Sequence, residues 1–254
     1  MSRTTELGAQ VVIFMKTKRR KFIASGIALT ACMVAPRLLA ETTTNNAELP
    51  KPRPAERVRP PRQDLAQVLR FVQAGHVDLP KVKEMLNQDP QFAIAAWDWG
   101  QGDWETALGG ASHVGRPDIA EYLLSKGARM DGFCAAMLGE RDVVLALLKA
   151  HPSVATTKGP HGYTLLYHVA ISGDIVTAEA LKPLLAPNAR DYNQALSAAA
   201  RDGRLEMTQW LLENGVTNPN VPDGFGKTAM DFATEKNFPE IAAELRRGGA
   251  YPKN

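Results

Sequence analysis

The chain has 254 residues, of which 44% are hydrophobic, 22% charged and 7% aromatic, a composition typical of a globular protein rather than a disordered one. No run approaches 18 consecutive apolar residues, which excludes a protein with several membrane-spanning helices, and two cysteines exclude a disulfide scaffold. The formal charge of +3 arises in residues 1–40, which hold seven Lys or Arg and one acid, so the rest of the chain has a net charge of −3. This balance gives no reason to expect a general nucleic-acid binder.

The N-terminal residues have the two parts of a signal peptide, a dense basic run followed by an uncharged apolar run. The apolar run, residues 22–35, is too short to cross a bilayer as a helix but long enough for the core of a signal peptide. Arg19, Arg20 and Phe22 resemble the twin-arginine export motif, although an ordinary secretory signal also starts with basic residues. We therefore predict that residues 1–40 are a twin-arginine-like signal peptide that directs the chain to the bacterial periplasm.

The mature N-terminus has two candidate positions. Cleavage after Ala40 gives a soluble protein, and this is the position that we favour. Residues 29–32 (LTAC) resemble a lipobox, which would put a lipid on Cys32 and make the protein an outer-membrane lipoprotein. Met15 is an alternative to Met1 as the start of translation, because the residues before it add nothing that a signal peptide needs.

A proline-rich segment, residues 41–62, follows the signal peptide and interleaves five prolines with Arg and Lys. Such chains form stiff, extended spacers without a core of their own, so we predict a disordered linker rather than a docking peptide. Cleavage after Ala40 would leave Cys134 as the one remaining cysteine of the two. Its apolar neighbours predict a buried core residue rather than a reactive thiol.

From Gln63 onward a pattern of apolar residues recurs. An opening residue, often Thr, is followed nine positions later by a Gly and 13, 17 and 18 positions later by Ile, Met or Leu. Spacings of three, four and seven residues place side chains on one face of a helix, so each copy predicts two short helices joined by a turn. The turns lie at residues 77, 115, 139, 173, 203 and 237, at intervals of 38, 24, 34, 30 and 34. Two short helices cannot bury a core alone, so the copies must stack.

These copies resemble ankyrin repeats. Residues 226–230 (GKTAM) and 162–166 (GYTLL) match the opening of the family's repeat, and residues 123–128 (LLSKGA) match its end. The resemblance covers residues 63–254 and implies an all-α fold, an α-solenoid of about six helix–turn–helix repeats with β-hairpin or loop fingers. The chain also resembles a bacterial, exported, single-domain subset of the family, which we associate with residues 97–106. Ankyrin stacks are interaction scaffolds, so the resemblance implies a protein partner and no catalytic activity.

The uneven intervals predict uneven fingers, a long one before residue 106 and no full finger before Phe133, with a notch between them. The long finger carries three of the four tryptophans, Trp97, Trp99 and Trp104. Tryptophans on a loop with acidic residues between them have the composition of an interface hot spot. The alternative is that Trp99 and Trp104 brace the finger, whereas Trp97 is the tryptophan that we favour for partner contact.

The resemblance also implies that partners touch the positions seven and eight residues after the opening residue. In the central copies these positions are apolar, which predicts an exposed binding patch. The alternative is that the missing finger lets the central helices pack closer and bury them. In the last two copies the positions are charged (residues 201–202 and 235–236), as expected of a solvated face. The predicted partner-binding residues are Trp97, Asp98, Trp99, Asp103, Trp104, Glu105, His113, Val114, Met137, Leu138, His161, Tyr163 and Ile171.

Five histidines raise the question of a metal or catalytic site. They lie at positions 76, 113, 151, 161 and 168, and no two are spaced as ligands on one helix, so we predict cap and surface histidines and no metal site. The sequence contains no nucleophile elbow, phosphate-binding loop or dinucleotide fingerprint, and we predict no catalytic residue and no cofactor. The alternative is a small ligand, metal or cofactor held in the central notch, with a periplasmic stress role. We expect a monomer that meets a membrane only if Cys32 is lipidated.

Overall fold

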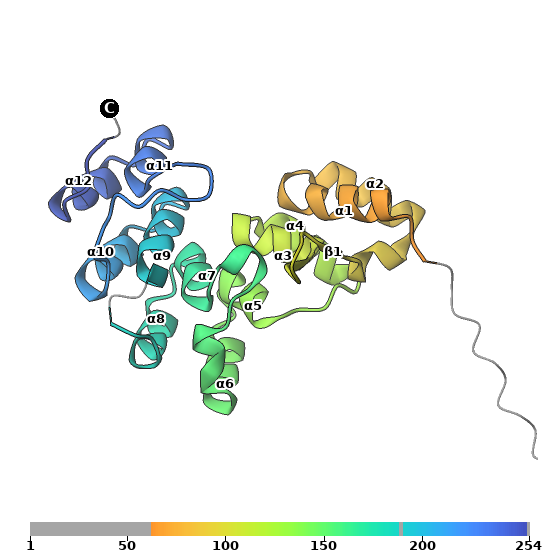
Figure 1. Ribbon diagram of the computed structural model, residues 1–254, viewed down its shortest axis with the longest axis horizontal. Helices are drawn as coiled ribbons and strands as arrows, with labels where there is room; N and C mark the ends of the chain where they lie inside the picture. Colours follow the sequence, from red (N-terminus) through yellow and green to blue (C-terminus); the bar gives the residue numbers. More distant parts are fainter. Residues whose placement is uncertain (1–61, 188–189, 253–254) are drawn as a thin grey trace, which may run out of the picture. The chain divides into compact units, whose positions relative to one another are not determined.

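The computed structural model describes residues 62–187 and 190–252, all within the compact unit Arg59–Asn254. The predicted signal peptide, its export motif, Cys32 and the linker up to Pro61 lie outside the described residues. The described part is mostly helical, with twelve α-helices and one two-stranded hairpin (Figure 1). The α-helices are α1 Leu65–Val77, α2 Leu79–Gln88, α3 Ala107–Val114, α4 Pro117–Ser125, α5 Gly132–Leu138, α6 Arg141–Ala150, α7 Leu165–Ser172, α8 Ile175–Leu181, α9 Arg190–Arg201, α10 Leu205–Asn214, α11 Ala229–Glu235 and α12 Pro239–Arg247. The strands are β1 Ala96–Asp98 and β2 Trp104–Thr106, and the 3-10 helices are η1 Pro90–Ile94, η2 Pro152–Thr156, η3 Pro160–Gly162 and η4 Lys182–Leu184.

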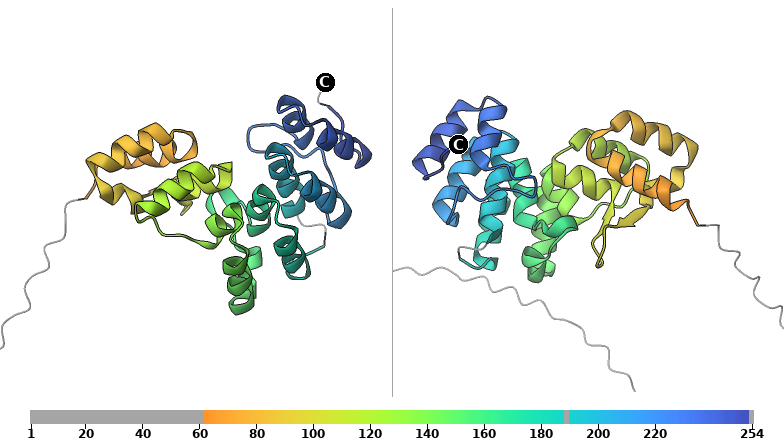
Figure 2. Two further views of the ribbon diagram at one scale, coloured as in Figure 1. Left: turned by 180° about the vertical axis from the view of Figure 1, so that it is seen from behind. Right: turned by 45° about the horizontal axis from the view of Figure 1, so that its top comes forward.

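The twelve helices form six consecutive pairs that pack in two layers. The odd-numbered helices pack on one another in chain order, from α1 on α3 to α9 on α11. In the second layer α2 packs on α4, and α6, α8, α10 and α12 follow one another. Figures 1 and 2 show the pairs succeeding one another from orange to blue. This arrangement confirms the predicted helical repeat fold of about six units.

The repeat pattern in the sequence marks the start and end of α3 and the start of α11. The Thr106 side chain accepts a hydrogen bond from the backbone N–H of Gly109 at 3.0 Å, so the opening residue of that copy is a helix N-cap. Thr228 does the same for α11 and forms a capping box with Asp231. The Gly nine positions after Thr106 is Gly115, whose φ of 74° is the left-handed conformation that ends a helix and that favours glycine.

The apolar residues 13 and 17 positions into the copy lie in the core in α4 and α10, whereas in α6 the corresponding Val143 is 47% exposed and the buried residues are Val144 and Leu148. Ile119 and Leu123 of α4 are 0% exposed, as are Met207 and Leu211 of α10. Burying such a side chain contributes about 1.5–3 kcal/mol, so the stack is held together mainly by these contacts. Cys134 is also fully buried, as predicted, and burial raises the pKa of its thiol to about 11. None of the described helices is long and apolar enough to cross a membrane.

The connections between units differ in length, as predicted. Residues 89–106 contain η1 and the β1–β2 hairpin, in which Trp97 pairs with Glu105, and the hairpin is the yellow finger in Figure 2. Residues 126–131, between α4 and α5, contain no strand and no helix. Helices α3 and α7, which belong to the second and fourth pairs, therefore come into contact beside α5.

The missing finger before α5 also lets the loops of the second and fourth pairs meet. Residues 157–163, which include η3, reach the β1–β2 hairpin. The backbone N–H of His161 donates to Asp103 Oδ1 at 3.0 Å, although the two residues are 58 positions apart. The absence of a finger before α5 thus brings two distant loops together, and the candidate site lies where they meet.

Candidate functional site

The three tryptophans of the long finger have different surroundings. Trp97, which the sequence favoured for partner contact, is half-buried and packs against the hydrophobic core, so only part of its ring is exposed. Trp99 is 38% exposed, and its Nε1–H donates to Glu105 Oε2 at 2.8 Å, which fixes the indole. Trp104 is 62% exposed. Trp104 is therefore the tryptophan whose surface is most available to a partner.

The predicted apolar patch across the central copies is not exposed. Met137 and Ile171 are only 4% and 3% exposed, while Val114 and Leu138 are half-buried. Helix α5 packs on both α3 and α7, and no finger holds these helices apart. The closer packing buries the side chains, so the alternative interpretation of this patch is correct for Met137 and Ile171.

The charged pair Arg201 and Asp202 is likewise not the solvated face that its position in the repeat predicted. The two side chains are 19% and 20% exposed and form an ion pair at 2.8 Å. Arg201 also donates to the Tyr167 hydroxyl at 3.1 Å. The Tyr167 hydroxyl in turn donates to the carbonyl oxygen of His113 at 3.1 Å, which ties α7 to the end of α3.

Three histidines and one glutamate meet where the two loops touch. We call His76, Glu105, His113 and His161 the His/Glu cluster; one ligand atom from each lies within 4.8 Å of the others. His113 Nε2 lies 3.1 Å from His76 Nε2 and 2.9 Å from Glu105 Oε1. Glu105 Oε2 lies 3.4 Å from His76 Nε2 and 3.5 Å from His161 Nε2. Of the three, His161 is exposed and His76 lies in the last turn of α1, as expected of cap and surface histidines, whereas His113 is buried.

The stacking of helices positions two members of the cluster. His76 and His113 are the penultimate residues of α1 and α3, which pack on each other, so their rings meet edge to face at 5.0 Å between centroids. Gly110 makes this contact feasible, because a Cβ there would lie 2.8 Å from the His76 ring. The His76 Nδ1–H donates to the carbonyl oxygen of Val72 at 3.0 Å, which directs Nε2 into the cluster.

The finger and η3 position the other two members. Glu105 is the middle residue of β2, and its side chain is fully buried. His161 has a φ of 56°, in the left-handed region, and Asp103 holds it there with both carboxylate oxygens. One oxygen accepts from the His161 backbone N–H, and the other accepts from Nδ1–H at 3.0 Å. Asp103 thereby turns the Nε2 of His161 toward Glu105.

The cluster combines a carboxylate with a buried imidazole. Burial by itself raises the pKa of Glu105, but the imidazoles of His113 and His76 and the Trp99 N–H outweigh it and hold the pKa below the usual value. Burial lowers the pKa of His113, and the nearby His76 and His161 lower it further, against the opposing effect of Glu105. At neutral pH the two shifts favour an ionised Glu105 beside an uncharged His113.

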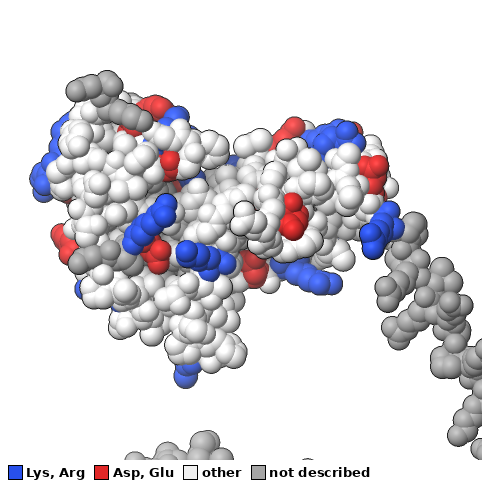
Figure 3. Space-filling view, in the orientation of Figure 1, with Lys and Arg blue, Asp and Glu red and all other residues white. Residues whose placement is uncertain are grey.

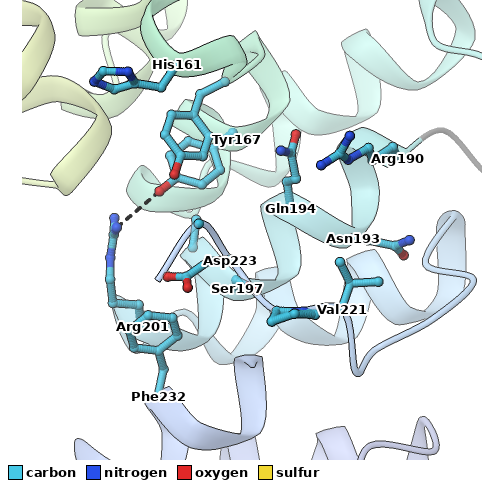
Figure 4. A pocket seen from close by; sticks show the side chains of 14 residues that line it. His161, Tyr167, Arg190, Asn193, Gln194, Ser197, Arg201, Val221, Asp223 and Phe232 are labelled. Carbon is cyan, nitrogen blue, oxygen red and sulfur yellow. Dashed lines mark hydrogen bonds between the residues drawn. The ribbon is translucent and has the colours of Figure 1, made fainter. Parts of the chain in front are cut away.

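Two hollows lie on either side of residues 157–163. The first, which we call the inner-helix pocket, has a volume of about 270 Å³ and is lined from α7, α9 and the loop before α11 (Figure 4). Arg201 and Tyr167 are hydrogen-bonded at its edge, and Gln194 and Arg190 line the opposite side. The second, the finger groove, has a volume of about 300 Å³ and is lined by Trp104, Phe133 and Lys158 among others. The finger groove occupies the place where the sequence predicted a notch.

Sequence reasoning missed two features of this face. Phe225 is 90% exposed in the loop before α11, beside Asp223 and Gly224 of the inner-helix pocket. The loop has the turn residues of a finger tip, which was the available signal. For the cluster, the signal was the shared position of His76 and His113 at the ends of neighbouring helices, whereas nothing local pointed to His161. His151 is exposed, and His168 is fully buried outside the cluster.

Comparison with known proteins supports the repeat assignment. Residues 196–243, from within α9 into α12, match the family model described as ankyrin repeats (many copies). No match was found among curated proteins. Ankyrin repeat domains are typically non-catalytic modules that bind other proteins. The helix pairs and this match together show that the chain contains ankyrin repeats, in residues 196–243, within a mostly helical repeat fold.

Proposed function

We propose that this protein is a non-catalytic scaffold that binds another protein on the face formed by the finger tips and the two hollows between them. The observation that carries this proposal is Trp104, a 62% exposed indole at the edge of the finger groove. Interface hot spots often consist of an exposed tryptophan next to a concave surface. Binding buries a large apolar area of the rigid ring and costs little side-chain entropy. Phe225 is a second exposed aromatic residue, in the loop whose Asp223 and Gly224 line the inner-helix pocket.

The size of the inner-helix pocket supports a protein partner better than a small ligand. At about 270 Å³, the inner-helix pocket is smaller than the roughly 300–1,000 Å³ of typical ligand pockets. Its walls carry Tyr167, Arg201 and Gln194, which suit one polar side chain of a partner. We therefore prefer protein binding to a small-ligand function at this pocket.

The charge distribution supports contact by shape rather than by long-range attraction. On the face in Figure 3, Lys and Arg side chains are interspersed with Asp and Glu, and most of the surface is neutral. Arg201 and Lys158 contribute positive charge near the hollows and Asp223 negative charge. A mixed surface gives little electrostatic steering, so we expect affinity to depend weakly on salt.

We also propose that the protein acts in the bacterial periplasm, on the basis of the basic and apolar runs in residues 16–35. Mass spectrometry of the chain from fractionated cells of the native host tests this. A mature chain beginning after Ala40 in the periplasmic fraction supports soluble export, and a lipid on Cys32 supports the envelope-anchored alternative. A full-length chain confined to the cytosol would refute both.

Site-directed photo-crosslinking in the native host tests the binding face. A photoreactive amino acid replaces Trp104 or Phe225 in two variants, and Lys149, an exposed residue of α6, serves as the matched control. We expect one partner protein to be captured at both aromatic positions and not at Lys149. Capture only at Lys149 would place the interface on the even-numbered helices and contradict the proposal.

Once the partner is purified, Trp104→Ala should weaken binding by about 2 kcal/mol, which is roughly 30-fold in Kd. The exposed Trp104 makes few contacts within the fold, so this variant should remain as stable as the wild type. A substitution at Met137 does not serve the same purpose, because this side chain is buried and its loss tests folding instead. An unchanged Kd for a folded Trp104→Ala variant would remove Trp104 from the interface.

A further inference from the structure

The His/Glu cluster has no role in the protein-binding proposal, and its geometry indicates a separate function. We infer that the cluster binds one divalent transition-metal ion of the zinc class. Its ligands would be the Nε2 atoms of His76, His113 and His161 and one carboxylate oxygen of Glu105. The inference does not depend on whether a partner protein binds nearby.

The separations within the cluster, which involve both oxygens of Glu105, are close to those between ligands of a tetrahedral metal ion. Bonds of about 2.0–2.1 Å from zinc to nitrogen or oxygen place the corners of a tetrahedron about 3.3 Å apart. The separations around His113 Nε2 are 3.1 Å to His76 and 2.9 Å to Glu105. Those around Glu105 Oε2 are 3.4 Å to His76 and 3.5 Å to His161. All four ligand atoms lie within 4.8 Å of one another, so shifts of up to about 1.5 Å would complete the coordination sphere.

Hydrogen bonds outside the cluster leave the Nε2 atoms of His76 and His161 free of protons, whereas His113 Nε2 would lose its proton when the ion binds. A carbonyl oxygen only accepts, so the bond from His76 to Val72 requires the proton on Nδ1. The bond from His161 to the Asp103 carboxylate likewise requires the proton of His161 on Nδ1. In neutral imidazoles both Nε2 atoms then present lone pairs toward Glu105. Outer hydrogen bonds of this kind, to a carbonyl or a carboxylate, orient the histidine ligands of known metal sites.

One carboxylate oxygen of Glu105 lacks a hydrogen-bond partner within the described part of the chain, and a metal ion would fill that place. Its side chain is fully buried, and Oε2 accepts from Trp99 Nε1. Oε1 has no hydrogen bond among the described residues, although His113 Nε2 lies 2.9 Å away, because the His113 N–H is aligned with His76 instead. A buried carboxylate oxygen without a hydrogen bond is unfavourable. A cation between this oxygen and the imidazole lone pairs would satisfy all of them.

The ligand types indicate both the metal class and the role. Three imidazoles and one carboxylate suit zinc and neighbouring transition metals, whereas magnesium and calcium prefer oxygen ligands only. Four protein ligands fill a tetrahedral zinc site, which is the pattern of structural sites. The ion would join α1, β2, α3 and η3, and so clamp the two loops that meet across the missing finger.

The test uses the full chain, purified without a polyhistidine tag and stripped of metal with a chelator. Zinc is titrated by calorimetry in competition with a chelator of known affinity, and X-ray absorption reports the coordination shell. The variants His76→Ala and His161→Ala remove ligands whose side chains are 20% and 33% exposed, and so spare the core. Asp103→Asn weakens the outer clamp on His161, and His151→Ala is the matched control on an exposed histidine.

We expect one zinc ion per wild-type chain, with a Kd of about 1 µM or tighter and four nitrogen or oxygen neighbours. Each ligand variant should lose about 100-fold or more in affinity, and Asp103→Asn roughly 10–100-fold. Zinc should raise the melting temperature of wild type and His151→Ala alike, but not of His76→Ala. If circular dichroism shows that a ligand variant does not fold, the zinc affinity of Asp103→Asn and the X-ray absorption spectrum of the wild type test the site instead.

Three outcomes would overturn the inference. The first is wild-type binding weaker than about 100 µM, which is too weak for a built site. The second is equal affinity in wild type, His76→Ala and His161→Ala, which would place the zinc elsewhere. The third is a six-coordinate shell without imidazole, which would indicate adventitious surface binding.

Discussion

The close approach of α1 to α3 predicts opposite effects for alanine at two helical glycines. A Cβ at Gly75 would lie 2.5 Å from the carbonyl oxygen of Ala107 and 2.6 Å from its Cα, both backbone atoms. A Cβ at Gly109 would meet its nearest neighbours at 3.4 Å, which is ordinary van der Waals contact. Gly75→Ala should therefore force the first two helix pairs apart, whereas Gly109→Ala should fit.

The magnitudes follow from two opposing effects. Relief of the clash at residue 75 requires a backbone shift of about 1 Å, and overpacking of this kind costs about 3 kcal/mol at the upper end of its range. Alanine is favoured over glycine within a helix by about 1 kcal/mol, which leaves Gly75→Ala destabilised by about 2 kcal/mol. At residue 109 only the gain remains, and we expect stabilisation of about 0.5 kcal/mol in the first turn of α3.

Urea unfolding followed by circular dichroism measures both variants against wild type, with the midpoint and the slope fitted together. Because each unit contacts mainly its neighbours, a weakened first interface should also lower the slope, as the α1–α2 pair unfolds separately. The reasoning is refuted if Gly75→Ala is as stable as Gly109→Ala, since the two substitutions differ in the space around the new methyl group. A crystal structure of the variant would then show α1 in an unchanged position.

The remaining predictions concern two buried titratable side chains. Burial, with His113 and Arg201 nearby, lowers the pKa of His168 to about 3, against the opposing hydrogen bond to the Thr164 carbonyl. The unfolded chain takes up a proton near the usual value of 6.5, so stability should be constant above that pH and fall by about 1.4 kcal/mol per unit between 6.5 and 3. His168→Asn keeps a donor for the Thr164 carbonyl and should reduce the slope of the unfolding free energy against pH by about one proton. Urea titrations at several pH values measure this slope, and equal slopes for the variant and the wild type would contradict the prediction. Cys134, with its raised pKa of about 11, should react with a thiol reagent at neutral pH only after unfolding, and rapid labelling of the folded chain would show that it is accessible.

Much of the fold follows from local signals in the sequence. The spacing of Ile119 and Leu123 predicted a buried helix face, and Thr106 and Gly115 marked the ends of the preceding helix. These signals lie within one or two helical turns, so they can be recognised in the sequence without knowledge of the tertiary structure. The count of residues between units likewise predicted the long finger and the missing one.

The exposure of individual side chains was predicted less well. The repeat position suggested exposed residues at Met137 and Ile171, yet both are buried, because the missing finger draws α3, α5 and α7 together. The composition of the long finger suggested a hot spot and favoured Trp97 within it, whereas Trp97 is half-buried and Trp104 is the most exposed of the three. Burial depends on which elements pack against a side chain, and the sequence of one finger does not say which elements those are.

The His/Glu cluster marks the boundary between what the sequence and what the tertiary structure determine. By itself the sequence determines the helices that carry His76 and His113 in their last turns and the missing finger beside them. Only the tertiary structure decides that His161 reaches Asp103, 58 positions away, and turns toward Glu105. Local spacing governs helices because their hydrogen bonds join residues four apart, whereas a site built from several units depends on how those units pack.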